Sequence, residues 1–301
     1  MQLSEVIIAF LTWADKTLSP ATVAGYRRQL EAFQAHAGDQ VVDELKPHHL
    51  MSWGHTWHRI QAVQRCFSWA ADEAELVARN PFTRIKRPPL GQRRRTLQRA
   101  ELVKLLRHAA HDFRRFLLAA RETIARPQEL RAICWEHLRY DELRGTLAGE
   151  LRAGRVVIVL EDFKSRKRRS DTNAVRVIPI TARFGRMLAR LAQIAGNLAG
   201  RVLLNARGKP WTKEAVRLRM KRLRKRLGMK ADHRGENVCC YTLRHTGGTD
   251  AAAAGIRDRV LAELMGHTSA RTTARYQHLE VAHLVDAAEK LAAHRKKKRA
   301  A

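Results

Sequence analysis

The chain has 301 residues, enough for two domains of ordinary size, and its 45% hydrophobic content allows real cores and argues against wholesale disorder. Lysine and arginine number 58 against 29 aspartates and glutamates, and the net charge of +29 predicts nucleic acid as the partner, since such a field attracts a polyanion. The four cysteines show no CxxC spacing, which predicts reduced thiols and no disulfides. The chain shows neither a signal-peptide pattern nor an apolar stretch of ~20 residues, so we expect a cytoplasmic, nucleoid-associated protein without membrane contact.

Residues 1–83 are predicted to form a helical domain. Ser19 and Pro20 are typical of a helix start, and apolar residues then recur at helical spacing at positions 23, 26, 30 and 33. A second periodic segment runs over 57–76. The stretch between them, PHHLMSWGHTWH, holds four histidines. No carboxylate or cysteine completes a ligand set there, so we interpret these histidines as solvated or phosphate-facing and expect no metal.

Residues 84–96 are predicted to be a basic linker. The stretch TRIKRPPLGQRRRT contains six basic residues, and its paired prolines stiffen it. The charge suits a strap across a phosphate backbone, although a merely solvated linker would have the same composition. The residues expected to bind DNA here are Arg84, Lys86, Arg87, Arg93, Arg94 and Arg95.

A second, mainly helical domain is predicted over 97–293, followed by a basic tail at 294–301. After helices to about residue 130, two β-branched runs at 155–160 and 175–180 predict a hairpin with the basic loop EDFKSRKRRSDTNA. Helices are expected again at 182–198, at 213–228 behind the capping residue Thr212, and within 241–293. The fold class is therefore mainly α with a small β-hairpin or sheet (α+β).

The helix after Thr212 has too sparse an apolar stripe to be buried on all sides. We interpret it as facing a DNA groove or phosphates. Its residues expected to bind DNA are Lys213, Arg217, Lys221 and Arg224.

The stretch LMGHTSARTTARYQHL places Tyr276 nine residues after His267 in a basic setting. A tyrosine that attacks a phosphodiester needs positive charge nearby, because its phenol is a weak nucleophile near its free pKa of ~10. The transition state gains negative charge that arginine forks can clamp, and the leaving oxygen needs a proton from lysine or histidine. Such chemistry needs no metal or other cofactor. The plain alternative is an amphipathic helix with a core tyrosine.

Four motifs in the second domain resemble those of the tyrosine recombinases, or phage integrase family. TIARPQEL resembles the box with the first catalytic arginine, which would be Arg126, with Glu129 as its acidic companion. The loop of the predicted hairpin resembles the one that carries the catalytic lysine, with Lys164 the best match and Lys167 an alternative.

The other two motifs lie nearer the C-terminus. YTLRHTGGT resembles the His-x-x-Arg-His box, which makes Arg244 the second arginine and His245 its neighbour. LMGHTSARTTARYQHL resembles the last box, with His267 beside the phosphate and Tyr276 as nucleophile. The first domain, through SPATVAGYRRQLEAF and NPFTRIKRPP, resembles the family's helical DNA-clamping domain.

Tyr241 departs from the family pattern, because it stands where the family usually has a histidine. A tyrosine can donate a hydrogen bond to a phosphate oxygen but is a poor general base near neutrality. We therefore expect Tyr241 to contact phosphate rather than to act as a base.

The resemblance implies a site-specific recombinase that acts on double-stranded DNA as a tetramer on paired sites, through a 3′-phosphotyrosyl intermediate, in integration or excision. A directionality factor is a possible further partner. The alternatives are DNA relaxation by a type IB topoisomerase, a catalytically idle DNA-binding regulator on the same fold, and a purely architectural basic protein. The sequence does not distinguish mobile-element integration from plasmid or chromosome resolution.

Overall fold

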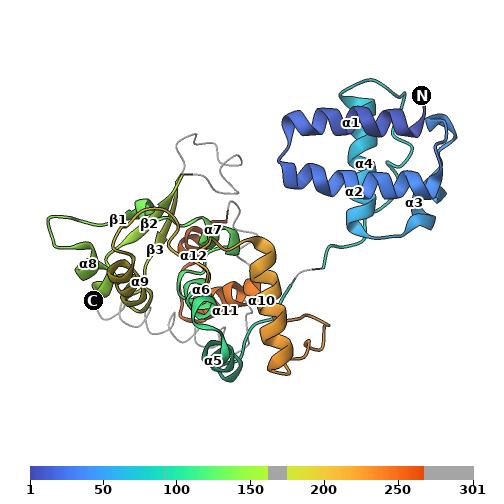
Figure 1. Ribbon diagram of the computed structural model, residues 1–301. Coiled ribbons are helices and arrows are strands. Elements are labelled where there is room, and N and C mark those ends of the chain that lie inside the picture. Colours follow the sequence, from blue (N-terminus) through green and yellow to red (C-terminus); the bar gives the residue numbers. More distant parts are fainter. Residues whose placement is uncertain (92, 162–174, 268–301) are drawn as a thin grey trace, which may run out of the picture. The chain divides into compact units, whose positions relative to one another are not determined.

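The computed structural model describes residues 1–91, 93–161 and 175–267 of the chain (Figure 1). The chain divides into two compact units, Met1–Gln92 and Arg93–Ala301. Lys164, Lys167 and Tyr276, three of the residues to which the sequence assigns chemistry, lie outside the described residues.

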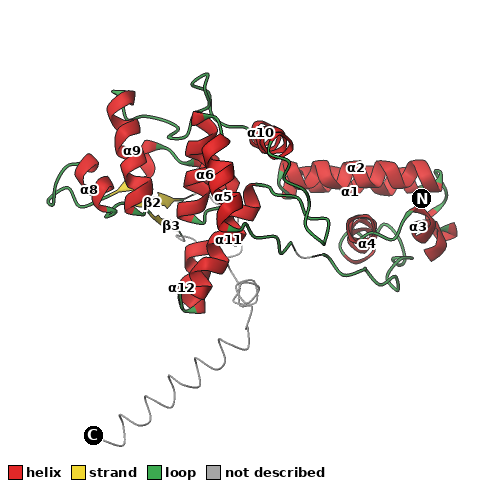
Figure 2. Ribbon diagram, turned by 90° about the horizontal axis from the view of Figure 1, so that it is seen from below, coloured by secondary structure: helices red, strands yellow, loops and turns green. Residues whose placement is uncertain are grey.

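The first unit is built from helices. They are α1 (Leu3–Thr17), α2 (Pro20–Ala37), α3 (Pro47–Trp53) and α4 (Trp57–Asp72), with a short 3₁₀ turn at Val42–Glu44. Helix α2 begins where the sequence predicts, because the Ser19 hydroxyl accepts a hydrogen bond from the Thr22 N–H and Pro20 occupies its first position. Helix α4 crosses α1 and α2, as the two views in Figures 1 and 2 show.

Four fully buried phenylalanines form the aromatic centre of this unit. They are Phe10, Phe33, Phe67 and Phe82. Phe82 contacts Phe33 and Phe67 edge-on, with ring centroids 5.7 and 5.1 Å apart. The chain after α4 is thus anchored on the helical core.

Gln64 on α4 holds the start of the segment predicted as a linker. Its amide nitrogen donates to the carbonyl oxygens of Phe82 and Ile85, both at 2.8 Å, and its amide oxygen accepts from Arg87 Nε at 2.7 Å. Arg84, Lys86 and Arg87 are all exposed, and Arg87 is also bound through its side chain to Gln64 in its own unit.

The second unit combines helices with one small sheet. Its helices are α5 (Arg99–His108), α6 (His111–Thr123), α7 (Pro127–Ala132), α8 (Leu147–Ala153), α9 (Ala182–Ala195), α10 (Lys213–Arg226), α11 (Cys240–Ala253) and α12 (Asp258–Met265), with a 3₁₀ turn at Trp135–His137. The antiparallel strands β1 (Leu138–Arg139), β2 (Val157–Leu160) and β3 (Arg176–Pro179) lie in the order β1-β2-β3. Val157 pairs with Pro179, and Leu160 pairs with Arg176.

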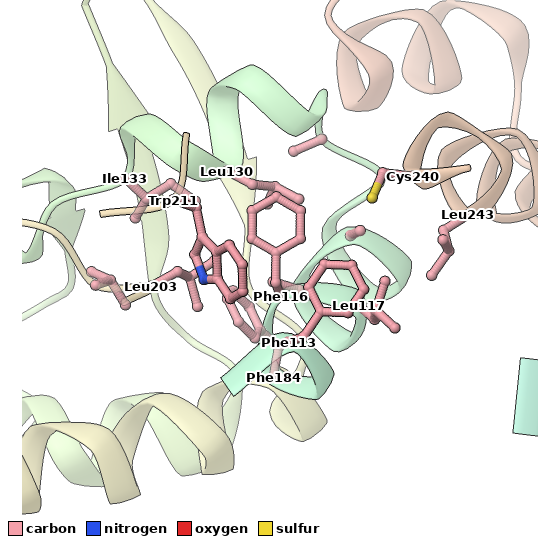
Figure 3. Packing of buried hydrophobic residues seen from close by; sticks show 14 of the residues in the cluster. Phe113, Phe116, Leu117, Leu130, Ile133, Phe184, Leu203, Trp211, Cys240 and Leu243 are labelled. Atoms are coloured by element: carbon pink, nitrogen blue, oxygen red, sulfur yellow. The ribbon is translucent and has the colours of Figure 1, made fainter. Parts of the chain in front are cut away.

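The core of the second unit surrounds α6. Phe113 and Phe116 on this helix are buried against Trp211, with ring centroids 5.5 and 6.0 Å from the indole (Figure 3). Leu203 and Ile133 lie in the same cluster. Each ring of this kind buries roughly 150–250 Å².

The predicted fold class, mainly α with a small β-sheet, is confirmed. The predicted hairpin is present as β2 and β3, and α9 and α10 lie where helices were expected. The sequence analysis did not assign the third strand β1 or the short helices α3 and α8 individually. Among the described residues, no helix combines the length and the apolar character needed to cross a membrane.

Candidate functional site

The site is organised around the C-terminal end of α12. This helix ends at Met265, and Gly266 then adopts a left-handed conformation with φ of +63°. His267 follows, and its backbone N–H donates to the Ala262 carbonyl at 2.8 Å. The last carbonyls of a helix have no partner within it and form the negative end of its dipole, so cations bind well there.

Arg126 reaches this helix end from the start of α7. The carboxylate of Glu129 holds it twice, accepting from its backbone N–H at 2.8 Å and from Nη1 at 2.6 Å. Pro127 at the first helical position sets the local geometry. Nη2 of Arg126 then donates to the Gly266 carbonyl at 2.7 Å, across 140 residues of sequence.

Arg244 reaches the same helix end from α11. Its side chain is buried, and it donates to the carbonyl oxygens of Ile124 at 2.6 Å and Met265 at 2.5 Å. Nη2 of Arg244 also lies 3.2 Å from Nε2 of His267. The structure thus brings together Arg126, Arg244 and His267, three of the residues that the sequence selected.

Arg176, on β3, is a member of this cluster that sequence reasoning missed. Its side chain is only 2% exposed, and it donates to the carbonyl oxygens of Glu263 and Leu264 on α12, both at 2.5 Å. The alternation of the strand held a signal, since positions 176, 178 and 180 share its buried face. An arginine in register with Ile178 and Ile180 has to enter the core.

Glu129 is the buried carboxylate that faces these cations. Its side chain is 2% exposed, and besides binding Arg126 it lies 3.9 Å from Arg176 Nε. Burial lowers the pKa of Arg176 to about 10, with Arg244 and Arg126 acting in the same direction and Glu129 opposing them. Arg176 remains charged at neutral pH, so the cluster has three guanidinium groups and one buried carboxylate, an arrangement suited to an anion.

Tyr241 and His245 lie on α11 with Arg244. Tyr241 is 41% exposed and lies in the first turn of the helix, three residues before Arg244 and hence on a neighbouring part of its surface. His245 is half-buried. The exposed phenol of Tyr241 is available to a ligand, which a core residue would not be.

The residues predicted to bind DNA on α10 fall into two groups. Lys213 and Lys221 are exposed. Arg217 pairs with Glu214 at 2.7 Å, and Arg224 donates to the Val238 carbonyl at 3.2 Å. Lysines with exposed ammonium groups are the better placed for phosphate.

The arginines of the RRR stretch bind within the second unit. The carboxylate of Glu236 accepts from the backbone N–H groups of Arg94 and Arg95 at 2.9 and 2.7 Å, and Arg93 donates to the Asn237 carbonyl. The side chain of Arg95 is 12% exposed and pairs with Glu101 at 2.6 Å. Arg95 therefore has a structural partner, while the side chains of Arg93 and Arg94 lie at the surface.

Comparison with known proteins agrees with the resemblance that the sequence motifs carry. The model of the phage integrase family matches residues 95–283. The tyrosine recombinase XerC of Erythrobacter litoralis is 27% identical over 93% of this chain and 89% of its own, and that of Ralstonia pickettii is 25% identical over 90% and 87%.

Two solved structures show a similar fold. The Tn1549 transposon integrase in complex with a circular intermediate DNA superposes with a TM-score of 0.74 at 16% identity, covering 97% of this chain and 99% of that one. A lambda integrase dimer bound to a COC′ core site gives 0.70 at 17% identity, covering 92% and 77%. The chain belongs to the phage integrase family and is a site-specific recombinase of the tyrosine type.

Proposed function

We propose that this recombinase cuts and rejoins double-stranded DNA through a 3′-phosphotyrosyl intermediate at Tyr276, with Arg126, Arg244 and His267 around the scissile phosphate. The observation that carries the proposal is the convergence of these three side chains at the end of α12, where His267 lies nine residues before Tyr276 in sequence. Guanidinium groups fixed in advance can stabilise the added negative charge of the transition state without reorganising.

The Tyr276 oxygen attacks phosphorus, and the bond to the 5′-oxygen breaks. Lys164, or Lys167 in its place, gives the leaving 5′-oxygen a proton, and Tyr241 donates a hydrogen bond to a phosphate oxygen. A 5′-hydroxyl from a partner strand then attacks the phosphotyrosyl bond and releases Tyr276. Because the covalent link conserves the bond energy, strand exchange needs no cofactor.

The DNA contacts in this proposal come from the exposed cations of both units. Arg84 and Lys86 lie in the first unit, and Lys213 and Lys221 on α10 lie in the second. Contacts of this kind bind phosphate rather than read base sequence, so affinity falls steeply with salt. Four protomers on two DNA sites would carry out integration or excision, with a directionality factor as a further partner.

The test is covalent capture on suicide substrates. Duplexes with a nick beside a randomised core are incubated with the protein, and adducts that survive detergent are isolated and sequenced. We expect adducts with wild type and with Tyr140→Phe, a matched control on a half-buried tyrosine, and none with Tyr276→Phe. Wild type without any adduct would exclude the phosphotyrosyl mechanism and leave a DNA-binding regulator.

A second arm separates recombination from relaxation. Paired duplexes carrying the selected site should exchange strands, which a topoisomerase IB acting on one duplex would not achieve. Relaxation of a supercoiled plasmid without strand exchange would favour the topoisomerase.

Tyr241 needs its own comparison on the same substrates. If its hydroxyl contacts phosphate, Tyr241→Phe cleaves more slowly than wild type, and Tyr241→His, which restores a donor, recovers part of the rate. Equal rates for wild type and Tyr241→Phe would remove the hydroxyl from the mechanism.

A further inference from the structure

Arg176 has no assigned role in the proposed chemistry, yet it donates to two main-chain carbonyls of α12. Nη1 donates to the Glu263 carbonyl and Nη2 to the Leu264 carbonyl, both at 2.5 Å. Nη1 also donates to the Val177 carbonyl at 2.9 Å, on its own strand. The guanidinium therefore joins β3 to the last turn of α12.

Three arginines, of which Arg176 and Arg244 are buried, each bind different carbonyl oxygens at the end of α12. Arg176 binds the carbonyls of residues 263 and 264, Arg244 binds that of residue 265, and Arg126 binds that of residue 266. The three come from β3, α11 and the start of α7. Successive carbonyls of a helix point along its axis, so donors on all of them fix both the position and the direction of the helix end.

His267 is the next residue along the chain. Its backbone is bound to the same helix end, and its ring lies beside Arg244. Any shift of the last turn of α12 would move His267 relative to Arg126 and Arg244. The position of a predicted catalytic side chain thus depends on contacts made one to four residues earlier.

Burying Arg176 is costly, since its side chain is only 2% exposed and a third cation is placed beside two others. A well-packed apolar side chain would avoid this cost, because buried charge is a weak source of stability. Glu129 offsets the repulsion only in part, at 3.9 Å from Arg176 Nε. An arginine at position 176, unlike an apolar side chain, supplies directed N–H donors that hold the helix end, which accounts for its presence there.

We infer that Arg176 is a positioning residue for strand cleavage: it holds the end of α12 so that His267 lies in register with Arg126 and Arg244. The inference rests on the proposed function for its catalytic consequence. The structural part of the inference, that Arg176 holds the end of α12, can be tested without measuring DNA cleavage.

The experiment compares Arg176→Met and Arg176→Lys with wild type in the full-length protein. Arg155→Met is the control, since Arg155 lies two residues before β2, is exposed, and pairs through its guanidinium with Glu150 at 2.5 Å. Amide hydrogen exchange reports on α12, with α9 and α10 as internal references. Filter binding gives the DNA affinity, and single-turnover adduct formation at saturating enzyme gives the cleavage rate.

In Arg176→Met, exchange should accelerate over 258–267 and remain as in wild type over α9 and α10. Cleavage should slow by on the order of 100-fold, as for a displaced catalytic group, while the DNA affinity stays within the range of the control. Arg176→Lys, whose ammonium can reach one of the two carbonyls, should recover part of both effects.

Several results would overturn the inference. They are unchanged exchange over α12, exchange that accelerates equally throughout the unit, a wild-type cleavage rate in Arg176→Met, or a lysine variant no better than methionine. Wild-type protein that forms no adduct would refute the proposed function and, with it, the catalytic half of the inference. The exchange data would still decide whether Arg176 controls α12.

Discussion

Nη2 of Arg244 lies 3.2 Å from Nε2 of His267 and donates at the same time to the carbonyl of Met265. Because a guanidinium cannot accept a hydrogen bond, the contact to His267 is a hydrogen bond only when Nε2 carries no proton. One arginine group thus binds both the helix end and the side chain that follows it, which ties the ring to the backbone.

Gly266→Ala should disable cleavage. Its φ of +63° strains any L side chain, and the added methyl would come within 2.7 Å of Arg176 Nε and 3.1 Å of Arg126 Nη1. Displacement of both guanidinium groups should lower the single-turnover rate on the order of 100-fold. Gly228→Ala is the control, with a φ of +64° and no heavy atom within 4 Å. Equal losses in the two variants would assign the effect to backbone strain alone.

Glu129→Gln should destabilise the second unit by about 3 kcal/mol, since it removes the buried carboxylate that faces Arg126 and Arg176. Denaturant titration measures this loss, and added DNA or sulfate should restore more stability to the variant than to wild type. Glu214→Gln, in an exposed pair with Arg217, should change stability by less than about 1 kcal/mol. A Glu129→Gln protein as stable as wild type would mean that the cluster needs no internal counterion.

Lys213→Gln combined with Lys221→Gln should weaken DNA binding at every sequence. If both exposed ammonium groups contact phosphate, the slope of log affinity against log salt should become shallower by about 0.9 for each lysine. Arg95→Gln should leave the slope unchanged, because Arg95 is paired with Glu101, and should lower stability instead. A salt slope that changes in Arg95→Gln and not in the lysine variant would reverse this assignment.

Gly185→Ala tests the packing of α8 on α9. A methyl at Gly185 would lie 1.7 Å from the Leu151 carbonyl oxygen, so the two helices would have to separate. We expect a loss of about 3 kcal/mol and a fall in Tm of about 6–12 °C. Gly25→Ala, in the middle of α2 with open space around it, should instead stabilise its unit by up to about 1 kcal/mol.

The four thiols should react in two classes. Burial raises the pKa of the Cys66 and Cys240 thiols, whereas Cys134 and Cys239 are partly exposed. Alkylation of native protein followed by mass spectrometry should therefore label Cys134 and Cys239 first.

The raised pKa values also have a consequence for stability. Thiols of the unfolded chain ionise above their usual pKa of ~8.5, while the two buried ones stay protonated. The two buried thiols therefore contribute fully to the free energy of unfolding below a pH of ~8.5, and this contribution is lost as the pH rises further. A Cys66→Ala, Cys240→Ala protein should lose less stability between pH 8 and 10 than wild type.

Much of the fold could be predicted because its helices carry local signals. Thr212 caps α10, and Ser19 with Pro20 begins α2, so these elements begin where the sequence indicates. Strand β1 has only two residues, too few for alternation to be recognised in the sequence, and its place depends on pairing with β2. Helix α8 contains Gly149 and is followed by Gly154, so its sequence resembles a loop, and its packing on α9 overrides that weak helix propensity.

The site could be predicted only in part. Arg126, Arg244 and His267 lie in motifs of fixed spacing, and the structure brings them together. Arg176 escaped notice because arginine is usually a surface residue and its acceptors are main-chain atoms distant in sequence. The pairing of Arg95 with Glu101 could not be foreseen either, since composition alone does not distinguish a paired arginine from a free one.

The arginines around α12 depend on carbonyl groups, which every amino acid supplies. Substitution of the side chains at Glu263 or Leu264 leaves those acceptors in place. Substitution of Arg176 removes the donors that bind them. Across diverging relatives, the donors should therefore remain constant while the side chains of the helix they hold drift. Positions 263 and 264 can therefore change their side chains and keep their acceptors, whereas Gly266, with its positive φ and close guanidinium neighbours, cannot.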